Sequence, residues 1–84
     1  MSCKSFLHEP GARMTYSEMI KTGARIRGLM ESNNLSVADL EAACGCSHQA
    51  VYYWLSGKAV PSVDNLLILA KLFHTTVDEI LVSE

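Results

Sequence analysis

Apolar residues recur at intervals of three and four along most of the chain, and no segment alternates apolar and polar residues. Intervals of three and four gather side chains on one face of an α-helix, whereas strands alternate with period two. The pattern predicts an all-α domain. Residues 1–14 lack it and contain Pro10 and Gly11, so we predict a flexible N-terminal arm followed by one helical domain at residues 15–84.

Five helices are predicted within that domain. The first spans about residues 16–33, after the capping pair Thr15 and Glu18, and the second follows Ser36 and ends at Gly45. The residues predicted to face inward from these two helices are Met19, Thr22, Ile26, Leu29, Met30 and Asn33 in the first, and Leu40, Ala43 and Cys44 in the second.

The third predicted helix, residues 48–56, has two contrasting faces. With about 100° per residue and Val51 at the origin, Leu55 lies near 40° and Trp54 near 300°, so these three should face the core. Gln49 lies near 160° and Tyr53 near 200°. The outward side is therefore polar and aromatic, without charge.

The fourth predicted helix, residues 63–73, is apolar around most of its circumference. Such a helix belongs at the centre of a domain or beneath a partner. A short fifth helix follows the pair Thr76 and Glu79 and carries Val77, Ile80 and Leu81.

Charge is unevenly distributed along these 84 residues, whose net charge is −2. Residues 1–30 carry five basic and two acidic side chains, whereas residues 31–84 carry two basic and seven acidic ones. Residues 42–63 contain no acid, so a polyanion approaching them would meet Lys58 and His48 with little repulsion. The acidic balance argues against indiscriminate nucleic-acid binding.

Two short helices joined at Gly45 describe a helix-turn-helix. Residues 22–81 resemble the phage Cro and repressor (XRE-like) family of DNA-binding domains through "LSVADL", "GCS", "AVYYWLSGK", "PS", "DNLLILAKLF" and "TTVDEIL", in that order. The resemblance implies a five-helix lambda-repressor-like bundle. It also implies sequence-specific double-stranded DNA binding by a small transcriptional regulator, most often a repressor, with helix 48–56 in the major groove.

The candidate site follows from this geometry. Gln49 is the best base reader, because its amide can bond adenine N6 and N7 together. The candidate base-contacting residues are His48, Gln49, Tyr52 and Tyr53, and the candidate phosphate-contacting residues are Ser36, Val37, Ser56, Gly57 and Lys58.

Family members of this length usually act as homodimers on two half-sites. We predict a homodimer whose contact includes Ile80, Leu81 and Val82. No membrane segment or secretory signal is visible, and the odd count of three cysteines fits the reducing cytoplasm. No cofactor is predicted.

Four positions depart from the family pattern. Val37 stands where the family often has a groove-edge glutamine, and Glu41 replaces a small residue where the two short helices cross. Met30 and Leu55 replace an Arg–Glu pair, so we predict that these two side chains touch.

Other functions fit the sequence less well than DNA binding. Cys44, Cys46 and His48 suggest zinc, but a fourth ligand is not evident, so no metal is predicted. No nucleophile with a nearby base can be identified, which argues against an enzyme. The serious alternative is a protein-interaction or antitoxin-type module in which DNA binding is secondary, because helix 63–73 has more apolar surface than a small bundle needs.

Overall fold

The computed structural model describes residues 14–83, and this part of the chain contains five helices and no strand, which confirms the all-α prediction. The predicted arm lies outside the described residues except for Met14. Every predicted helix is present and ends within one residue of the expected position. The helices are α2 (Tyr16–Ser32), α3 (Val37–Cys44), α4 (His48–Ser56), α5 (Val63–Leu72) and α6 (Val77–Ile80).

Each helix begins after a serine or threonine whose side-chain oxygen accepts a hydrogen bond from the third helical amide. Such N-caps satisfy an amide that has no acceptor within its helix. The reciprocal bond of a capping box is formed by Glu18 to Thr15 and by Asp39 to Ser36. The helix boundaries are therefore fixed by local sequence.

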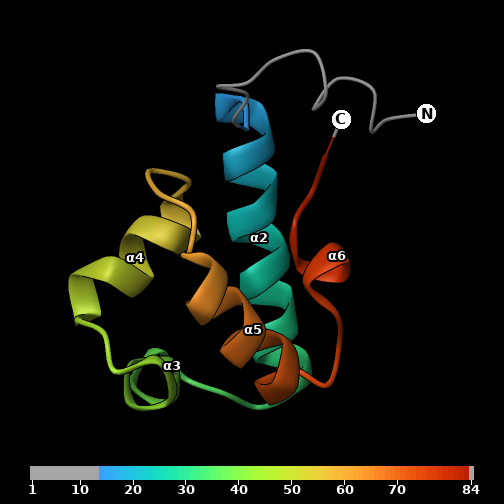
Figure 1. The fold of residues 1–84 in the computed structure, drawn as a ribbon. Helices are drawn as coiled ribbons and strands as arrows, with labels where there is room; N and C mark the ends of the chain where they lie inside the picture. The colour runs from blue at the N-terminus through green and yellow to red at the C-terminus, as the bar shows by residue number, and fades with distance from the viewer. Residues whose placement is uncertain (1–13, 84) are drawn as a thin grey trace.

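The arrangement leaves α4 covered on one side (Figure 1). α2 runs through the middle and contacts α4 and α6, while α3 contacts α4 and α5, and α5 contacts α6. Within the described residues, only α2 and α3 pack substantially on α4. The face of α4 opposite these two helices remains open.

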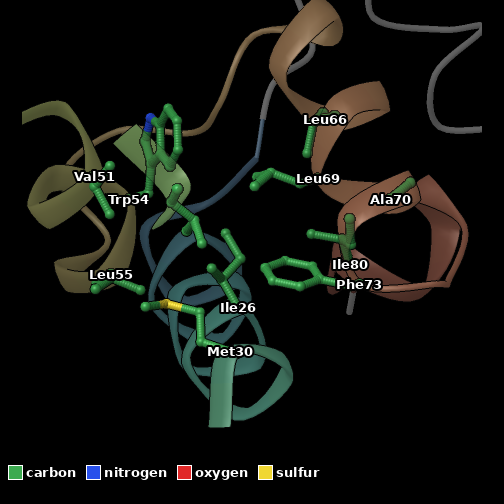
Figure 2. Packing of buried hydrophobic residues seen from close by; sticks show 11 residues of the cluster. Ile26, Met30, Val51, Trp54, Leu55, Leu66, Leu69, Ala70, Phe73 and Ile80 are labelled. Carbon is green, nitrogen blue, oxygen red and sulfur yellow. The ribbon is translucent and has the colours of Figure 1, made fainter. Parts of the chain in front are cut away.

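One hydrophobic core joins all five helices (Figure 2). Val51, Trp54 and Leu55 are buried in it, as predicted for the inner face of α4. Met30 lies in the same cluster, and Figure 2 shows its side chain pointing toward Leu55; the contact between the two side chains stays a prediction. The other buried members are Ile26, Leu40, Leu66, Leu69, Ala70, Phe73 and Ile80.

α2 and α4 approach each other closely at Gly23. A Cβ atom there would lie 2.4 Å from the backbone oxygen of Trp54 and 2.7 Å from that of Leu55. Only glycine permits this backbone approach. A residue that lowers helix propensity thus allows the two helices to meet.

One residue of the predicted inner faces needs correction. Ala43 is exposed, because α3 turns the sector from Leu40 through Cys44 toward the core, and Ala43 lies outside that sector. On α5, Leu67 is 51% exposed and Val63 is 72% exposed. The described fold covers only part of the apolar surface of α5.

The C-terminal residues are bound to α2. The backbone amide of Val82 donates to the Thr22 hydroxyl at 2.9 Å, and the Arg25 guanidinium donates to the carbonyl of Glu79. Ile80 is fully buried between these two contacts. None of the helices formed by residues 14–83 has the length and apolar content needed to cross a membrane.

Candidate nucleic-acid interface

The turn between α3 and α4 is short and left-handed at one residue. Gly45 adopts φ 64°, and its amide donates to the carbonyl of Glu41 at 2.8 Å, which ends α3. Glycine adopts positive φ at little steric cost because it has no Cβ atom. Ser47 then caps α4 through the Ala50 amide at 3.1 Å. Residues 45–47 therefore join the two helices of the helix-turn-helix.

The four candidate base-contacting residues lie on one exposed surface of α4, which we call the outer face: His48, Gln49, Tyr52 and Tyr53. The side-chain amide of Gln49 donates to the Tyr53 hydroxyl at 2.8 Å. The ring of His48 meets that of Tyr52 edge to face, with centroids 4.7 Å apart. Neighbours on the helix surface thus order one another.

Lys58 extends this surface beyond the end of α4. Its ammonium nitrogen lies 5.6 Å from the centroid of the Tyr53 ring, a cation–π distance. The Tyr53 ring is also held by Gln49, so one aromatic side chain links the amide to the cation. The ammonium group of Lys58 therefore adds a positive charge to the outer face at the carboxyl end of α4.

The other end of α4 carries a negative group from α3. Nδ1 of His48 lies 2.5 Å from Oε2 of Glu41, although the two residues are seven positions apart in the chain. Residues 42–63 contain no acidic residue, but the fold places the carboxylate of Glu41 beside them. The expectation that an approaching polyanion meets little repulsion there needs this correction. The sequence feature that pointed to this contact is Glu41, because Cro and repressor domains carry a small residue at this position.

The carboxylate of Glu41 is accommodated between α3 and α4 because it is partly exposed and contacts His48. Its side chain is 28% exposed and meets the more exposed side chain of His48. A negative charge near the amino end of α4 is favourable, because unpaired amides there carry partial positive charge. α4 has no acidic residue in its own first turn.

Two of the predicted phosphate contacts are unavailable as backbone donors. The Ser36 amide donates to Asp39 at 2.8 Å. Gly57 is buried, and its amide bonds the carbonyl of Trp54 at 3.3 Å. Capping at these helix ends uses both backbone amides, and the phosphate contacts of Ser36 and Gly57 stay predictions.

The remaining phosphate candidates keep usable groups. Val37 is in the first turn of α3, where amides lack an acceptor within the helix. The Lys58 amide bonds the Tyr53 carbonyl at 2.9 Å, but its side chain is exposed. The hydroxyl of Ser56 is exposed as well and donates weakly to the same carbonyl at 3.3 Å.

Cys44 and Cys46 flank the turn and are partly buried against the core. Burial raises the pKa of the Cys44 thiol, with the charge and hydrogen bonding of Cys46 adding to the effect. A raised pKa lowers the thiolate fraction, and the thiolate is the form that binds metals. Among residues 14–83, no group of three or more His, Cys, Asp or Glu side chains is placed to hold a metal ion.

The three residues of the predicted dimer contact differ in solvent exposure. Ile80 belongs to the core and has no exposed surface, whereas Leu81 and Val82 are partly exposed. Any partner meeting this end of the domain would touch the last two residues, because Ile80 lies beneath the described surface.

Comparison with known proteins identifies the family. The model of the helix-turn-helix family matches residues 26–80, which include α3, the turn and α4. The chain belongs to the helix-turn-helix family. As the resemblance to Cro and repressor domains implied, it is an XRE-type DNA-binding regulator.

Among solved structures, the chain is similar to the restriction-modification controller protein C.AhdI from Aeromonas hydrophila. The sequence identity is 27%, the match covers 79% of this chain and 100% of that chain, and the TM-score is 0.70. No curated protein matches the sequence.

Proposed function

We propose that the chain is a transcriptional repressor that binds a specific double-stranded DNA site as a homodimer, with α4 lying in the major groove. The observation that carries this proposal is the contrast across α4: Val51, Trp54 and Leu55 are buried, while Gln49 and its partner Tyr53 are exposed. An α-helix fits the major groove, where its exposed side chains reach base edges.

Gln49 is the proposed reader of adenine. Its amide nitrogen carries two hydrogens, of which one is bonded to Tyr53 at 2.8 Å. The second hydrogen and the amide oxygen remain for adenine N7 and N6, the bidentate pairing that distinguishes adenine from other bases. The tyrosine hydroxyl thus fixes the orientation of the amide before DNA binds, which lowers the entropic cost of the contact.

Tyr52 and Tyr53 are proposed to contact thymine methyl groups with their rings or a phosphate with their hydroxyls. Their exposed fractions of 47% and 39% support this role. Lys58, Ser56 and the first amides of α3 would bond phosphates on either side of the groove and so position α4.

The small number of basic residues in one domain supports a homodimer. The chain carries a net charge of −2, so a single copy would gain little from phosphate neutralisation. Two copies on two half-sites would combine their contacts. We propose Leu81 and Val82 as part of the dimer contact, since both retain exposed surface beside the buried Ile80.

The similarity to a restriction-modification controller protein supports a role in transcriptional control. Free thiols at Cys44 and Cys46 favour a reducing compartment such as the cytoplasm, where DNA is also accessible. A binding module without catalytic chemistry is the proposed class.

One observation favours a second candidate function. Val63 and Leu67 form an exposed apolar pair one turn apart on α5. Such a pair suits a protein partner, as in an antitoxin-type module, and in that case DNA binding would be secondary.

Selection of bound duplexes from a random library, followed by gel-shift titration, tests the proposal. A defined site containing an adenine in each half, bound with a salt-dependent affinity, is the expected result. The variant Tyr53→Phe, which removes the hydroxyl that accepts a hydrogen bond from Gln49, should weaken discrimination at that adenine, whereas loss of a phosphate contact would weaken binding to all duplexes equally. Absence of any shift at low salt would contradict DNA binding and leave the protein-interaction function.

A further inference from the structure

The contact between His48 and Glu41 has a consequence for base selection. We propose that Glu41 sets the hydrogen-bonding polarity of the His48 ring and thereby determines which base His48 selects. The inference rests on the proposed placement of α4 in the major groove, and it assigns Glu41 as a positioning residue for His48.

The ionised carboxylate of Glu41 can only accept hydrogen bonds. Since its Oε2 lies 2.5 Å from Nδ1 of His48, the hydrogen of that contact must be on Nδ1. A neutral imidazole carries one N–H and one acceptor nitrogen, and the bond made by one nitrogen sets the state of the other. In the neutral ring, Nε2 is therefore an acceptor.

An acceptor at Nε2 selects different bases from a donor. In the major groove, cytosine N4 and adenine N6 present hydrogens, whereas guanine presents only the acceptors O6 and N7. Neutral His48, held by Glu41, is thus suited to cytosine or adenine. Once the ring is protonated, Nε2 donates and guanine becomes the favoured base.

The position of the His48 ring suits this role. The ring is held on one side by Glu41 and on another by the edge-to-face contact with Tyr52, yet 63% of the side chain is exposed. Two contacts order the ring, and the exposure leaves its remaining nitrogen open to a base.

Among residues 14–83, few groups lie close enough to influence the ring. Glu41 on α3 and the phenol of Tyr52 contact it directly. The thiols of Cys44 and Cys46, in the adjoining turn, pack against the core. α2 meets the opposite end of α4, where Ile20 lies against Gly57 and Gly23 against Trp54. Glu41 is thus the charged group that contacts the imidazole from a neighbouring element.

A purely structural role for Glu41 makes a different prediction. If the carboxylate only stabilises the amino end of α4, its removal lowers stability and changes affinity for all duplexes by one common factor. A positioning role changes the ratio of affinities between duplexes that differ at a single base pair. The ratio and the tautomer therefore separate the two roles.

The tautomer is measured first, by ¹⁵N-edited NMR of the imidazole nitrogens in the full chain without DNA at about pH 8.5, above the ordinary histidine titration. His48 is expected to carry its hydrogen on Nδ1, and Glu41→Ala is expected to move the population to Nε2. The exposed His74 serves as an internal reference whose signals stay unchanged. A wild-type His48 protonated on Nε2 would overturn the inference, whether or not the protein binds DNA.

Base preference is measured next, by titrating the selected duplex and its variants at the base pair nearest His48. Wild-type protein should prefer cytosine or adenine over guanine by about tenfold at about pH 8.5. Glu41→Ala should reduce the high-pH preference to about twofold or less. Glu31→Ala, which removes an exposed carboxylate from α2, should leave the ratio unchanged.

A double variant shows whether Glu41 acts through His48. In a His48→Ala background, Glu41→Ala should leave the base ratio unchanged, while circular dichroism verifies that each variant is folded. An equal ratio in wild type and Glu41→Ala would overturn the inference while leaving DNA binding intact. Failure of the wild type to select any duplex would instead count against the proposed function.

Discussion

The two faces of α4 differ in how they are determined. The inner face consists of Val51, Trp54 and Leu55, and all three are buried in the core. The outer face carries Gln49 and Tyr53, which are exposed and bonded to each other. Helical periodicity alone separates the two sets, but only the inner set is determined by burial of apolar area.

The difference shows which properties can be read from a local pattern. An inner position needs only an apolar side chain of fitting volume, so its neighbours along the helix predict it. An outer position depends on groups from other elements, such as Glu41 of α3 beside His48 and Lys58 beside Tyr53. Stability and recognition should therefore respond separately to substitutions on the two faces.

The largest expected effect lies on the inner face. Trp54→Ala should lower the free energy of unfolding by about 3–5 kcal/mol, because it removes a buried ring and leaves a cavity. Tyr52→Ala, on the outer face of the same helix, should cost less than about 1 kcal/mol. Urea unfolding followed by circular dichroism measures both, and similar losses would erase the distinction between the faces.

Substitutions at Gly23 test how closely α2 packs against α4. Gly23→Ala places a Cβ atom 2.4 Å from the Trp54 carbonyl oxygen, so the helices must separate, at an expected cost of about 1–3 kcal/mol. Gly28→Ala in the same helix meets nothing within 4 Å and should stabilise by about 0.5–1 kcal/mol. Thermal unfolding of the pair gives opposite signs if the close approach of α2 and α4 is correct.

A substitution at Gln49 tests whether the outer face of α4 contributes to base recognition rather than to stability. Gln49→Ala should weaken binding to the selected duplex by about 1–3 kcal/mol and remove the preference for adenine, while stability stays within about 0.5 kcal/mol of wild type. Gel-shift titration and urea unfolding report these two quantities. A variant that loses stability but keeps its base preference would assign Gln49 to the fold.

Lys58 should produce the smallest change. Lys58→Ala removes a cation next to the outer face, so affinity should fall by a similar factor for every duplex and the salt slope should decrease by about one. Lys71→Ala, in the last turn of α5, removes an equal charge from another element. Equal salt slopes for the two variants would mean that Lys58 does not meet a phosphate.

The fold was predictable because its determinants are local. Ser and Thr caps and the left-handed Gly45 place the helix ends, and apolar spacing identifies buried residues such as Ile26 and Leu69. Ala43 was assigned inward and is exposed, since most residues of the short helix α3 are apolar or small and their spacing does not fix which side faces the core. The burial of Gly57 against Ile20 is a tertiary contact that no local pattern contains.

The candidate site was predictable only in part. Periodicity placed Gln49 and Tyr53 on the exposed side, but their mutual hydrogen bond depends on rotamers. Glu41 was identified as unusual without a partner, because its meeting with His48 requires the geometry of the turn. The phosphate contacts of Ser36 and Gly57 stay predictions, and the sequence did not show that the amides of both residues form hydrogen bonds within the fold.

The claim that α4 reads bases with its outer face is tested most directly by a double-mutant cycle between Gln49 and adenine N7. The selected duplex is prepared with 7-deazaadenine, which lacks the N7 acceptor, and titrated with wild type and Gln49→Ala. The modified duplex should bind wild type about tenfold more weakly and Gln49→Ala with no further loss. Unchanged wild-type affinity for every deaza-substituted duplex would contradict the account.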